Sequence, residues 1–282
     1  MNREWSPGVP QRLGDTQVPV HRILGRNPGP MTGPGTNSYL IGDQRLCLLD
    51  PGPVDEEQLQ SFLAAIGERQ LLYILLTHTH RDHSPGAVPL AAQTGAEIIG
   101  LQAPEAVGQD YSVVMDKLWQ HGDTLELGEY TLELIHTPGH VSNHFCYLLR
   151  EEQLLFTGDH VLQGTTPVIL PPDGDMADYL ESLKLLQERD LRYLAPGHGD
   201  LMNKPQQEIA QLIAHRMRRE EKIIACLSEL ESASVDELVL SAYDDVAEHL
   251  IPWAKRTLLA HLYKLEREQR ARVDEQVWQM RG

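Results

Sequence analysis

The sequence predicts a layered α/β domain followed by a small helical domain, and three observations lead to this prediction. Over the first 205 residues, short apolar runs typical of buried strands alternate with segments of helical spacing. After that point the helical pattern dominates, and a hairpin-like pattern ends the chain. The length of 282 residues is sufficient for one large hydrophobic core and a small appended domain.

The strands and helices expected in the α/β domain follow one another with short connections. The Gly/Pro-rich stretch "NPGPMTGPGTNSYLIG" contains a loop and the short strand "SYLI", and the strand "RLCLLD" ends at "PGP". "EEQLQSFLAAIG" has helical spacing and a terminal glycine, whereas "LLYILLT" is continuously apolar, as expected for a buried strand. The later expected elements are a helix near residues 86–93, the strand "AEIIG", strands near 124–136, the strands "HFCYLL" and "QLLFTG", a helix over 177–189 and the strand "RYLAP".

The chain beyond residue 205 predicts three helices and a terminal ribbon. "QQEIAQLIAHRMRREEKIIACLSEL" is a long charged amphipathic helix, and Ser234 with Glu237 forms the pattern of a capping box that opens a second helix. The third helix places Leu258, Leu262 and Leu265 on one stripe, and "ARVDEQVWQM" suits a hairpin. We therefore expect three parts, namely a flexible leader over residues 1–18, an α/β domain over 19–205 and a winged-helix-like domain over 206–282.

The composition narrows the classes of partner and the compartment. Lys and Arg total 24 against 41 Asp and Glu, a formal charge of −17 that repels nucleic acid and anionic membranes at long range. Three widely spaced cysteines without a CxxC pair favour a reducing compartment. The N-terminal stretch lacks the apolar core of a signal peptide, and no run approaches the ~20 apolar residues of a membrane span. We expect a cytoplasmic protein with no membrane partner.

The stretch "LLTHTHRDHSPG" (residues 75–86) places three histidines and an aspartate directly after an apolar strand. In an extended segment His78 and His80 point to the same side, while Asp82 and His83 follow where the loop begins. Imidazole and carboxylate ligands without thiolate suit zinc, with iron or manganese as alternatives. The spacing predicts two rings for one cation and a carboxylate with a third ring for a neighbouring one.

Four other short motifs carry a polar residue at a strand end or a Pro-Gly turn. "HTPGH" ends with His140, "FTGDH" contains Asp159 and His160, "APGHGD" presents His198 between glycines, and "LLDPGP" begins its turn at Asp50. Each motif lies where a strand passes into a loop, which is the position where layered α/β folds place their ligands. We therefore expect all of them to converge on one edge of the sheets.

These motifs, in this order, resemble the metallo-β-lactamase superfamily over roughly residues 20–205. The resemblance implies a four-layered αβ/βα metallo-β-lactamase sandwich with two divalent metals, expected to be zinc, at one edge of two facing sheets. It implies that His78, His80 and His140 bind the first metal, that Asp82, His83 and His198 bind the second, and that Asp159 bridges them.

The resemblance also implies roles for other residues and a reaction type. Asp50 orients a metal ligand, His144 and His160 lie behind the ligands or along the pocket wall, and Asp82 is both a ligand and a candidate proton shuttle. Metal binding lowers the pKa of water to about 7, so a metal-bridging hydroxide is available at neutral pH. The expected reaction is hydrolysis of an ester, thioester, lactam or related small molecule.

Two alternatives remain open at this stage. A group of β-lactamase-like proteins that includes a mitochondrial single-stranded RNA endonuclease shares "NPGPMTGPGTNSYLIG", "THTHRDHS", "TPGH", "PGHG" and "HRMRREEKI" with this chain, which makes single-stranded RNA a second candidate substrate. A partner-binding module with a vestigial metal site is the other alternative, and a homodimer is compatible with each. "HRMRRE" reads as a solvated helix face with i,i+4 ion pairs or as a substrate-facing basic patch.

Overall fold

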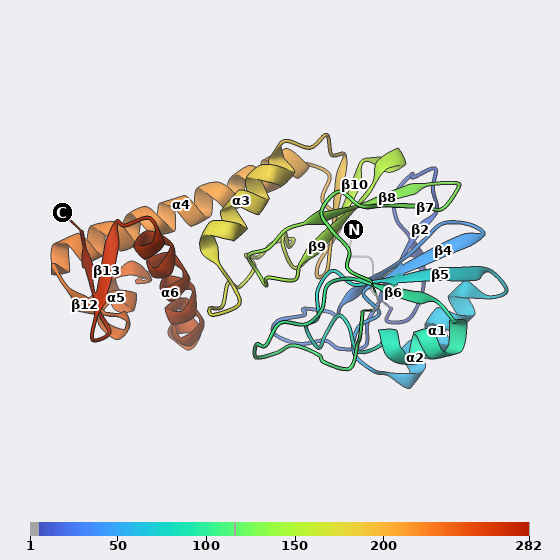
Figure 1. Ribbon diagram of the computed structural model, residues 1–282, viewed down its shortest axis with the longest axis horizontal. Helices are drawn as coiled ribbons and strands as arrows, with labels where there is room; N and C mark the ends of the chain where they lie inside the picture. The colour runs from blue at the N-terminus through green and yellow to red at the C-terminus, as the bar shows by residue number, and fades with distance from the viewer. Residues whose placement is uncertain (1–5, 116, 282) are drawn as a thin grey trace. The chain divides into compact units, whose positions relative to one another are not determined.

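The computed structural model describes residues 6–115 and 117–281, and the chain divides into two compact units (Figure 1). Unit 1 carries two β-sheets, and unit 2 carries the long C-terminal helix and the elements that follow it. Unit 1 consists of Met1–Thr137, Asn143–Thr166 and Asp190–Pro205, and unit 2 of Pro138–Ser142, Pro167–Arg189 and Gln206–Gly282.

The first sheet of unit 1 has six strands in the order in which they occur along the chain. Its first four strands pair antiparallel, whereas the last three, β4, β5 and β6, are parallel. Helices α1 (Glu56–Ile66) and α2 (Ala87–Thr94) form the two crossovers of this parallel part and lie together beside it in Figure 1. The strands are β1 (Gln11–Arg12), β2 (Val20–Leu24), β3 (Asn37–Ile41), β4 (Arg45–Leu49), β5 (Gln70–Leu75) and β6 (Glu97–Ile99).

The second sheet of unit 1 has five strands in the order β11-β10-β9-β8-β7. Strands β10 and β11 are parallel, and the other pairs are antiparallel. A 3-10 helix, η1 (Arg150–Glu152), forms the turn between β9 and β10. The strands are β7 (Thr124–Glu126), β8 (Thr131–His136), β9 (Phe145–Leu149), β10 (Leu154–Gly158) and β11 (Tyr193–Pro196).

The core of unit 1 has two layers because successive strand residues point to opposite faces. In β3, Leu40 packs with the apolar residues of α1 and α2, whereas Tyr39 and Ile41 pack against the second sheet. Phe156 of β10 stands 5.0 Å from Tyr39, ring centre to ring centre, across the space between the sheets. Both faces of the first sheet are thus covered, which explains why its strands read as continuous apolar runs.

Unit 2 contains three long helices and a small sheet. The capping box predicted at Ser234 and Glu237 is confirmed at the start of α5, since each residue's side chain bonds the other's backbone N–H. The terminal ribbon is confirmed as β13 and β14, in a sheet of order β12-β14-β13. The elements are α3 (Met176–Gln187), α4 (Pro205–Leu230), β12 (Ala233–Ser234), α5 (Val235–Ala242), η2 (Glu248–Leu250), α6 (Ile251–Arg267), β13 (Ala271–Asp274) and β14 (Val277–Met280).

Two expectations from the sequence differ from the structure. The segment expected to be a loose leader contains β1 at Gln11–Arg12, and residues 1–5 lie outside the described part of the chain. The prediction of a solvated "HRMRRE" face was wrong for Arg216, which is buried and donates to the carbonyl of Pro167, and for Arg219, which binds the carboxylate of Asp245. Among the described residues, no helix combines the length and apolar character needed to cross a membrane.

Candidate metal centre

The polar residues of unit 1 that the sequence singled out lie where strands end. Asp50 follows β4, the segment with His78 to His83 follows β5, Asp159 follows β10, and His198 follows β11. Two backbone hydrogen bonds hold these ends of the two sheets together. The N–H of Asn37 donates to the carbonyl of Gly197 at 2.7 Å, and the N–H of Phe145 donates to the carbonyl of Thr77 at 2.7 Å.

Four of the predicted ligands converge on one point, and ligand atoms of Asp82, His83, Asp159 and His198 all lie within 4.8 Å of one another. Nε2 of His198 is 3.3 Å from Oδ2 of Asp82 and 3.4 Å from Oδ1 of Asp159. Nε2 of His83 is 3.6 Å and 3.4 Å from the same two oxygens. Ligand atoms about 2.0–2.1 Å from a tetrahedral zinc ion lie roughly 3.3 Å apart, so this set, which we call the four-ligand cluster, has the spacing of a metal site.

The charges of the four-ligand cluster favour a cation. Burial by itself lowers the pKa of His83, but the carboxylates of Asp159 and Asp82 outweigh it and raise the pKa well above its usual value of 6.5. The pKa of His198 is raised for the same reason. Burial acts to raise the pKa of Asp82, yet the two histidines lower it to about 2. The negative charge of the two carboxylates, which favours the protonated rings, would also attract a divalent cation to this position.

A second pair of predicted ligands lies on the same segment. Nε2 of His78 and Nδ1 of His80 are 3.0 Å apart, and the two rings meet edge to face with centres separated by 4.6 Å. These two nitrogens therefore point toward each other, as expected for residues two apart in an extended segment. His140, the predicted third ligand, lies in unit 2, where it is buried and hydrogen-bonds through Nδ1 to the carbonyl of Val168 at 2.7 Å. Its role at the first metal stays a prediction.

Four of the predicted ligand rings have one nitrogen held by an oxygen acceptor, and in His78 it is Nδ1, 3.0 Å from the Thr77 hydroxyl. Nδ1 of His83 donates to Oδ2 of Asp50 at 2.9 Å, and Nδ1 of His198 faces the carbonyl of Gly35 at 3.3 Å. His140 makes the corresponding bond to Val168. A hydrogen bond of this kind fixes the proton on Nδ1 and leaves the lone pair on Nε2, which is the usual support of a metal-binding histidine. Donors of nitrogen and oxygen in this arrangement fit a divalent metal such as zinc.

Asp50 faces His83 and Thr77 rather than the centre of the cluster. Its Oδ2 accepts from Nδ1 of His83 and from the Thr77 hydroxyl at 2.7 Å, and its Oδ1 accepts from the Thr77 N–H at 2.8 Å. The backbone φ of Asp50 is 47°, a left-handed value that costs about 1 kcal/mol for a side chain of this type. Both side-chain oxygens are thus committed to orienting the segment that carries the ligands.

His144 and His160 are fully buried in unit 1. Nδ1 of His144 lies 2.9 Å from the Thr137 hydroxyl, and the His144 ring stacks on that of His78 at 5.3 Å. The His160 ring is 5.7 Å from that of His144. This position behind His78 is one of the two that the resemblance implied for these residues.

Several supporting residues escaped the sequence analysis. The Thr79 hydroxyl donates to Oε1 of Gln109 at 2.5 Å and accepts from the Asn143 amide at 2.7 Å, so it ties the ligand segment to two distant loops. The Thr36 hydroxyl donates to the carbonyl of Asp82 at 2.9 Å. Thr79 alternates with the histidines of "THTH", but its partners are 30 and 64 residues away, and no local pattern identifies them.

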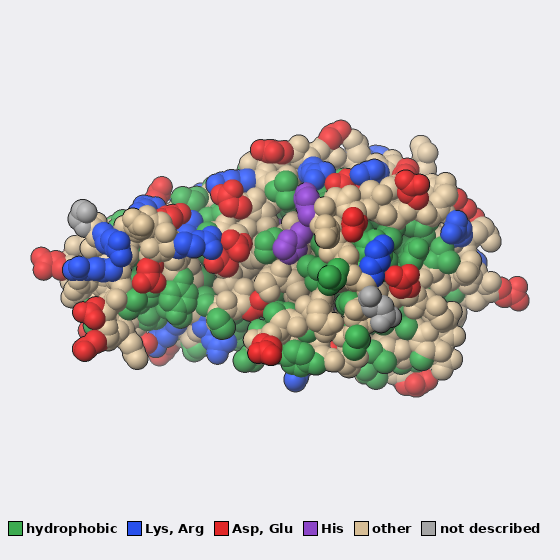
Figure 2. Space-filling view, viewed as in Figure 1, with side chains coloured by type: hydrophobic (Ala, Val, Ile, Leu, Met, Phe, Trp, Pro, Cys, Tyr) green, Lys and Arg blue, Asp and Glu red, His purple; other side chains and the backbone are tan. Residues whose placement is uncertain are grey.

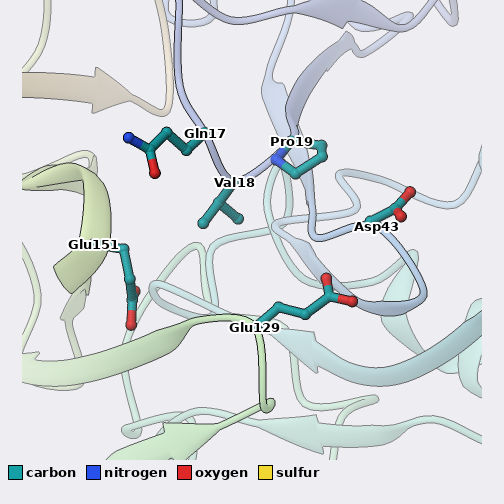
Figure 3. A pocket seen from close by; sticks show the side chains of 6 residues that line it. All are labelled: Gln17, Val18, Pro19, Asp43, Glu129 and Glu151. Atoms are coloured by element: carbon teal, nitrogen blue, oxygen red, sulfur yellow. The ribbon is translucent and has the colours of Figure 1, made fainter.

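A pocket of about 340 Å³ lies elsewhere in unit 1 and contains none of the predicted ligands. Its lining includes the acidic side chains of Asp43, Glu129 and Glu151, which come from separate segments and do not converge on one point (Figure 3). This pocket is therefore separate from the four-ligand cluster.

Comparison with known proteins assigns the family. Residues 6–198 match the model described as the metallo-β-lactamase superfamily, and residues 234–278 match the β-lactamase associated winged helix domain. The chain belongs to the metallo-β-lactamase superfamily. The class expected from the sequence, a metal-dependent hydrolase of this superfamily, is confirmed.

Two relatives illustrate the range of the family. A β-lactamase-like protein 2 homolog from Caenorhabditis elegans is 32% identical over 272 residues, which covers 90% of this chain and 84% of the relative. An atrochrysone carboxyl ACP thioesterase from Aspergillus fumigatus is 36% identical over 219 residues, which covers 75% of this chain and 66% of the relative.

Solved structures confirm the predicted metallo-β-lactamase fold with its appended winged helix. A β-lactamase domain protein from Burkholderia ambifaria matches with a TM-score of 0.79 at 19% identity, and the match covers 99% of this chain and 96% of the other. A metallo-β-lactamase family protein from Thermus thermophilus matches with a TM-score of 0.76 at 22% identity, covering 93% and 98%. At these identities the likeness concerns the fold.

Proposed function

We propose that this protein is a dinuclear zinc hydrolase of small acyl substrates, with thioesters and esters ahead of lactams. The observation that carries the proposal is the four-ligand cluster, in which two carboxylates and two imidazoles meet at metal-ligand spacing. His78, His80 and His140 would hold the first ion, and Asp159 would lie between the two ions.

Each side chain of the site has a definite task in this proposal. Two bound divalent ions would supply a Lewis acid for the substrate carbonyl and a nucleophilic hydroxide at neutral pH. Asp50 holds the ring of His83 in place, and the Gly35 carbonyl does so for His198. The Asp82 side chain is 31% exposed against 13% for Asp159, so Asp82 is the carboxylate placed to pass a proton between the site and solvent.

The charge of the molecule supports a small substrate over RNA. The chain carries a formal charge of −17, and on the face shown in Figure 2 lysine and arginine side chains are interspersed with acidic ones. Several cations of unit 2 are already paired within that unit, such as Arg219 with Asp245 and Arg267 with Asp175. A polyanion requires a continuous positive surface. The thioesterase among the relatives supports a thioester.

Metal analysis combined with a substrate panel tests the proposal. The purified protein is assayed for bound metal and then against an acyl thioester, a lactone, a cephalosporin, bis-p-nitrophenyl phosphate and labelled single-stranded RNA. We expect close to two zinc ions per chain and turnover of the thioester or lactone, both lost in Asp82→Asn and retained in the control Asp43→Asn, which changes an exposed carboxylate. If the wild type cleaves RNA but none of the acyl substrates, and Asp82→Asn loses the RNA cleavage, then the substrate is RNA and the acyl proposal is wrong.

A further inference from the structure

Two loops of unit 1 display apolar side chains beside the metal-ligand segment, and we propose that they bind the apolar acyl chain of the substrate. The first, called the long loop, covers residues 101–118 without residue 116, and the second, called the glycine loop, covers residues 27–36. The inference rests on the proposed acyl hydrolase activity and narrows its substrate to esters or thioesters of long, uncharged acyl groups.

The long loop is fastened directly to the residues that carry the ligands. The N–H of Asp110 donates to the carbonyl of Thr79 at 2.7 Å, and the Thr79 hydroxyl donates to Gln109. A side-chain carbon at Gly108 would lie 3.6 Å from Cδ2 of His80. The long loop therefore passes His80 at van der Waals distance, on the ring edge remote from the nitrogen that faces His78.

The long loop exposes its apolar side chains although it is firmly anchored. Val113 is 1% exposed and belongs to the core beneath α1 and α2, while Trp119, just past the loop's end, is 8% exposed and belongs to the core between the sheets. Between and beside these anchors, Val107 is 97% exposed, Leu118 82% and Val114 68%. Exposure of several aliphatic side chains in one short segment is uncommon unless the segment meets an apolar partner.

The glycine loop borders the other end of the ligand segment. Its Thr36 hydroxyl donates to the carbonyl of Asp82, and its Gly35 carbonyl accepts from Nδ1 of His198. Met31, near the tip of this loop, is 52% exposed. A flexible, unbranched methionine adapts to apolar ligands of different shape. The long loop contacts Thr79 and His80, and the glycine loop contacts Asp82 and His198, so both loops border the residues that carry the ligands.

An uncharged chain is the occupant that these residues favour. Within the long loop, Nζ of Lys117 is stacked 3.6 Å from the centre of the Trp119 ring, and the other described charges, Glu105 and Asp110, are negative. These charges give the long loop no surplus of positive charge for an anionic group, whereas burial of an apolar chain is favoured in proportion to its area. Each methylene fully covered by the loops would raise affinity by up to about fourfold.

A series of thioesters with acyl chains of two to ten carbons tests the inference on the metal-loaded enzyme. We expect kcat/KM to rise with chain length in the wild type, and the ratio of the ten-carbon to the two-carbon value to fall at least about tenfold in the double variant Val107→Ser, Leu118→Ser. Val9→Ser makes the same substitution at an exposed valine of unit 1 outside both loops, and it should leave the ratio unchanged.

A binding measurement separates this inference from the proposed function. Calorimetry on the metal-free protein with an uncleavable decyl thioether should show weaker binding by the double variant than by the wild type and Val9→Ser. Equal chain-length ratios and equal thioether binding in the wild type and the double variant would overturn the loop assignment. If no thioester of any length is cleaved while the loop-dependent thioether binding persists, the acyl hydrolase proposal fails and the apolar site stands.

Discussion

Each unit of the molecule buries histidine next to carboxylate, but the negative charge of the carboxylates has different partners in the two clusters. In unit 2, Glu220 of α4 is 1% exposed and accepts from Nζ of Lys264 at 2.8 Å and from Nδ1 of His261 at 3.2 Å, both on α6. Arg270 adds a further contact at 3.4 Å. In unit 1, the carboxylates of Asp82 and Asp159 meet imidazole nitrogens at 3.3 to 3.6 Å.

We call the group around Glu220 the closed cluster, because lysine and arginine balance its charge, and the group around Asp82 and Asp159 the open cluster. Lysine and arginine neutralise Glu220 permanently, so burial lowers the pKa of His261 and favours its neutral ring, a result opposite to that for His83. In unit 1, Asp82 and Asp159 contact the imidazole nitrogens of His83 and His198, and the two carboxylates raise the pKa values of those rings. A closed cluster supports packing, whereas an open cluster supports a ligand that brings its own charge.

The largest expected effect is at the open cluster. Asp159→Asn keeps the shape of the side chain but removes the charge that lies between the two predicted metals. Because changes to groups that merely support a ligand cost 10–100-fold, we expect metal affinity and kcat/KM to fall by at least about a thousandfold. Metal content after dialysis and thioester hydrolysis measure this, with the exposed Asp43→Asn as the control. If Asp159→Asn kept full metal occupancy and full activity, Asp159 would not be a metal ligand.

Breaking the closed cluster should instead affect stability. Glu220→Gln leaves Lys264, which is 8% exposed, without its buried counter-charge, and such a loss costs about 3–5 kcal/mol of unfolding free energy. Urea unfolding followed by tryptophan fluorescence, to which the buried Trp278 of unit 2 contributes, measures this loss. The control Glu268→Gln removes the more exposed partner of Lys264 and should cost under about 1 kcal/mol. If the two variants were equally stable, the buried pair of Glu220 and Lys264 would contribute no more to stability than the exposed pair of Glu268 and Lys264.

Asp50→Asn tests whether a residue that touches no metal still sets metal affinity. The amide keeps one acceptor oxygen for the Thr77 N–H, and its NH2 group then faces Nδ1 of His83 and cannot accept from it, so we expect metal affinity to fall about 10–100-fold with the fold intact. Competitive zinc titration and the circular dichroism spectrum measure the two properties. Unchanged zinc affinity would mean that the contact with Asp50 holds only the backbone.

The smallest effect is a pH dependence confined to unit 2. Burial acts to raise the pKa of Glu220, but His261 and Lys264 outweigh it and the pKa is lowered. The pKa of His261 is lowered from 6.5, mainly by burial. Both folded-state values lie below their unfolded ones, so the stability they contribute is present above pH 6.5 and is lost as the pH falls. Trp278 fluorescence during urea unfolding at about pH 7.5, 6 and 4.5 should show decreasing stability, and less decrease below about pH 6 in Glu220→Gln.

The local chemistry of the site was readable from the sequence because each ligand lies in a short motif at a strand end. The alternation of Thr77 to His80 and the turns around Asp159 and His198 are features of a few consecutive residues, and the fold brings three of these segments together in unit 1. Helix boundaries such as Asp55 before α1 and Ser234 before α5 were equally local, since the capping side chain lies within the same turn.

Features that depend on distant partners were not readable. His261 is fully buried, and Glu220, 41 residues earlier, supplies its hydrogen bond, a partner that no local pattern identifies. The pairing of Arg219 with Asp245 spans 26 residues and replaced the i,i+4 pairs that the helix pattern favoured. The long loop, with no helical or alternating pattern, gave no signal at all, although Gln109 and Asp110 anchor it to the ligand segment.

The separation of the ligands along the chain has a consequence for how the metal centre is made. Asp82 and His83 are neighbours, but Asp159 lies 76 residues after His83 by sequence number (159 − 83 = 76), and His198 follows a further strand. An unfolded chain therefore offers an ion short local groups of ligands, such as the histidines and the aspartate between residues 78 and 83. The complete four-ligand cluster exists only after both sheets have docked. The amount of metal bound per chain in a fresh preparation should consequently measure the fraction of chains that are correctly folded. We expect chains produced without metal to fold first and to bind zinc afterwards.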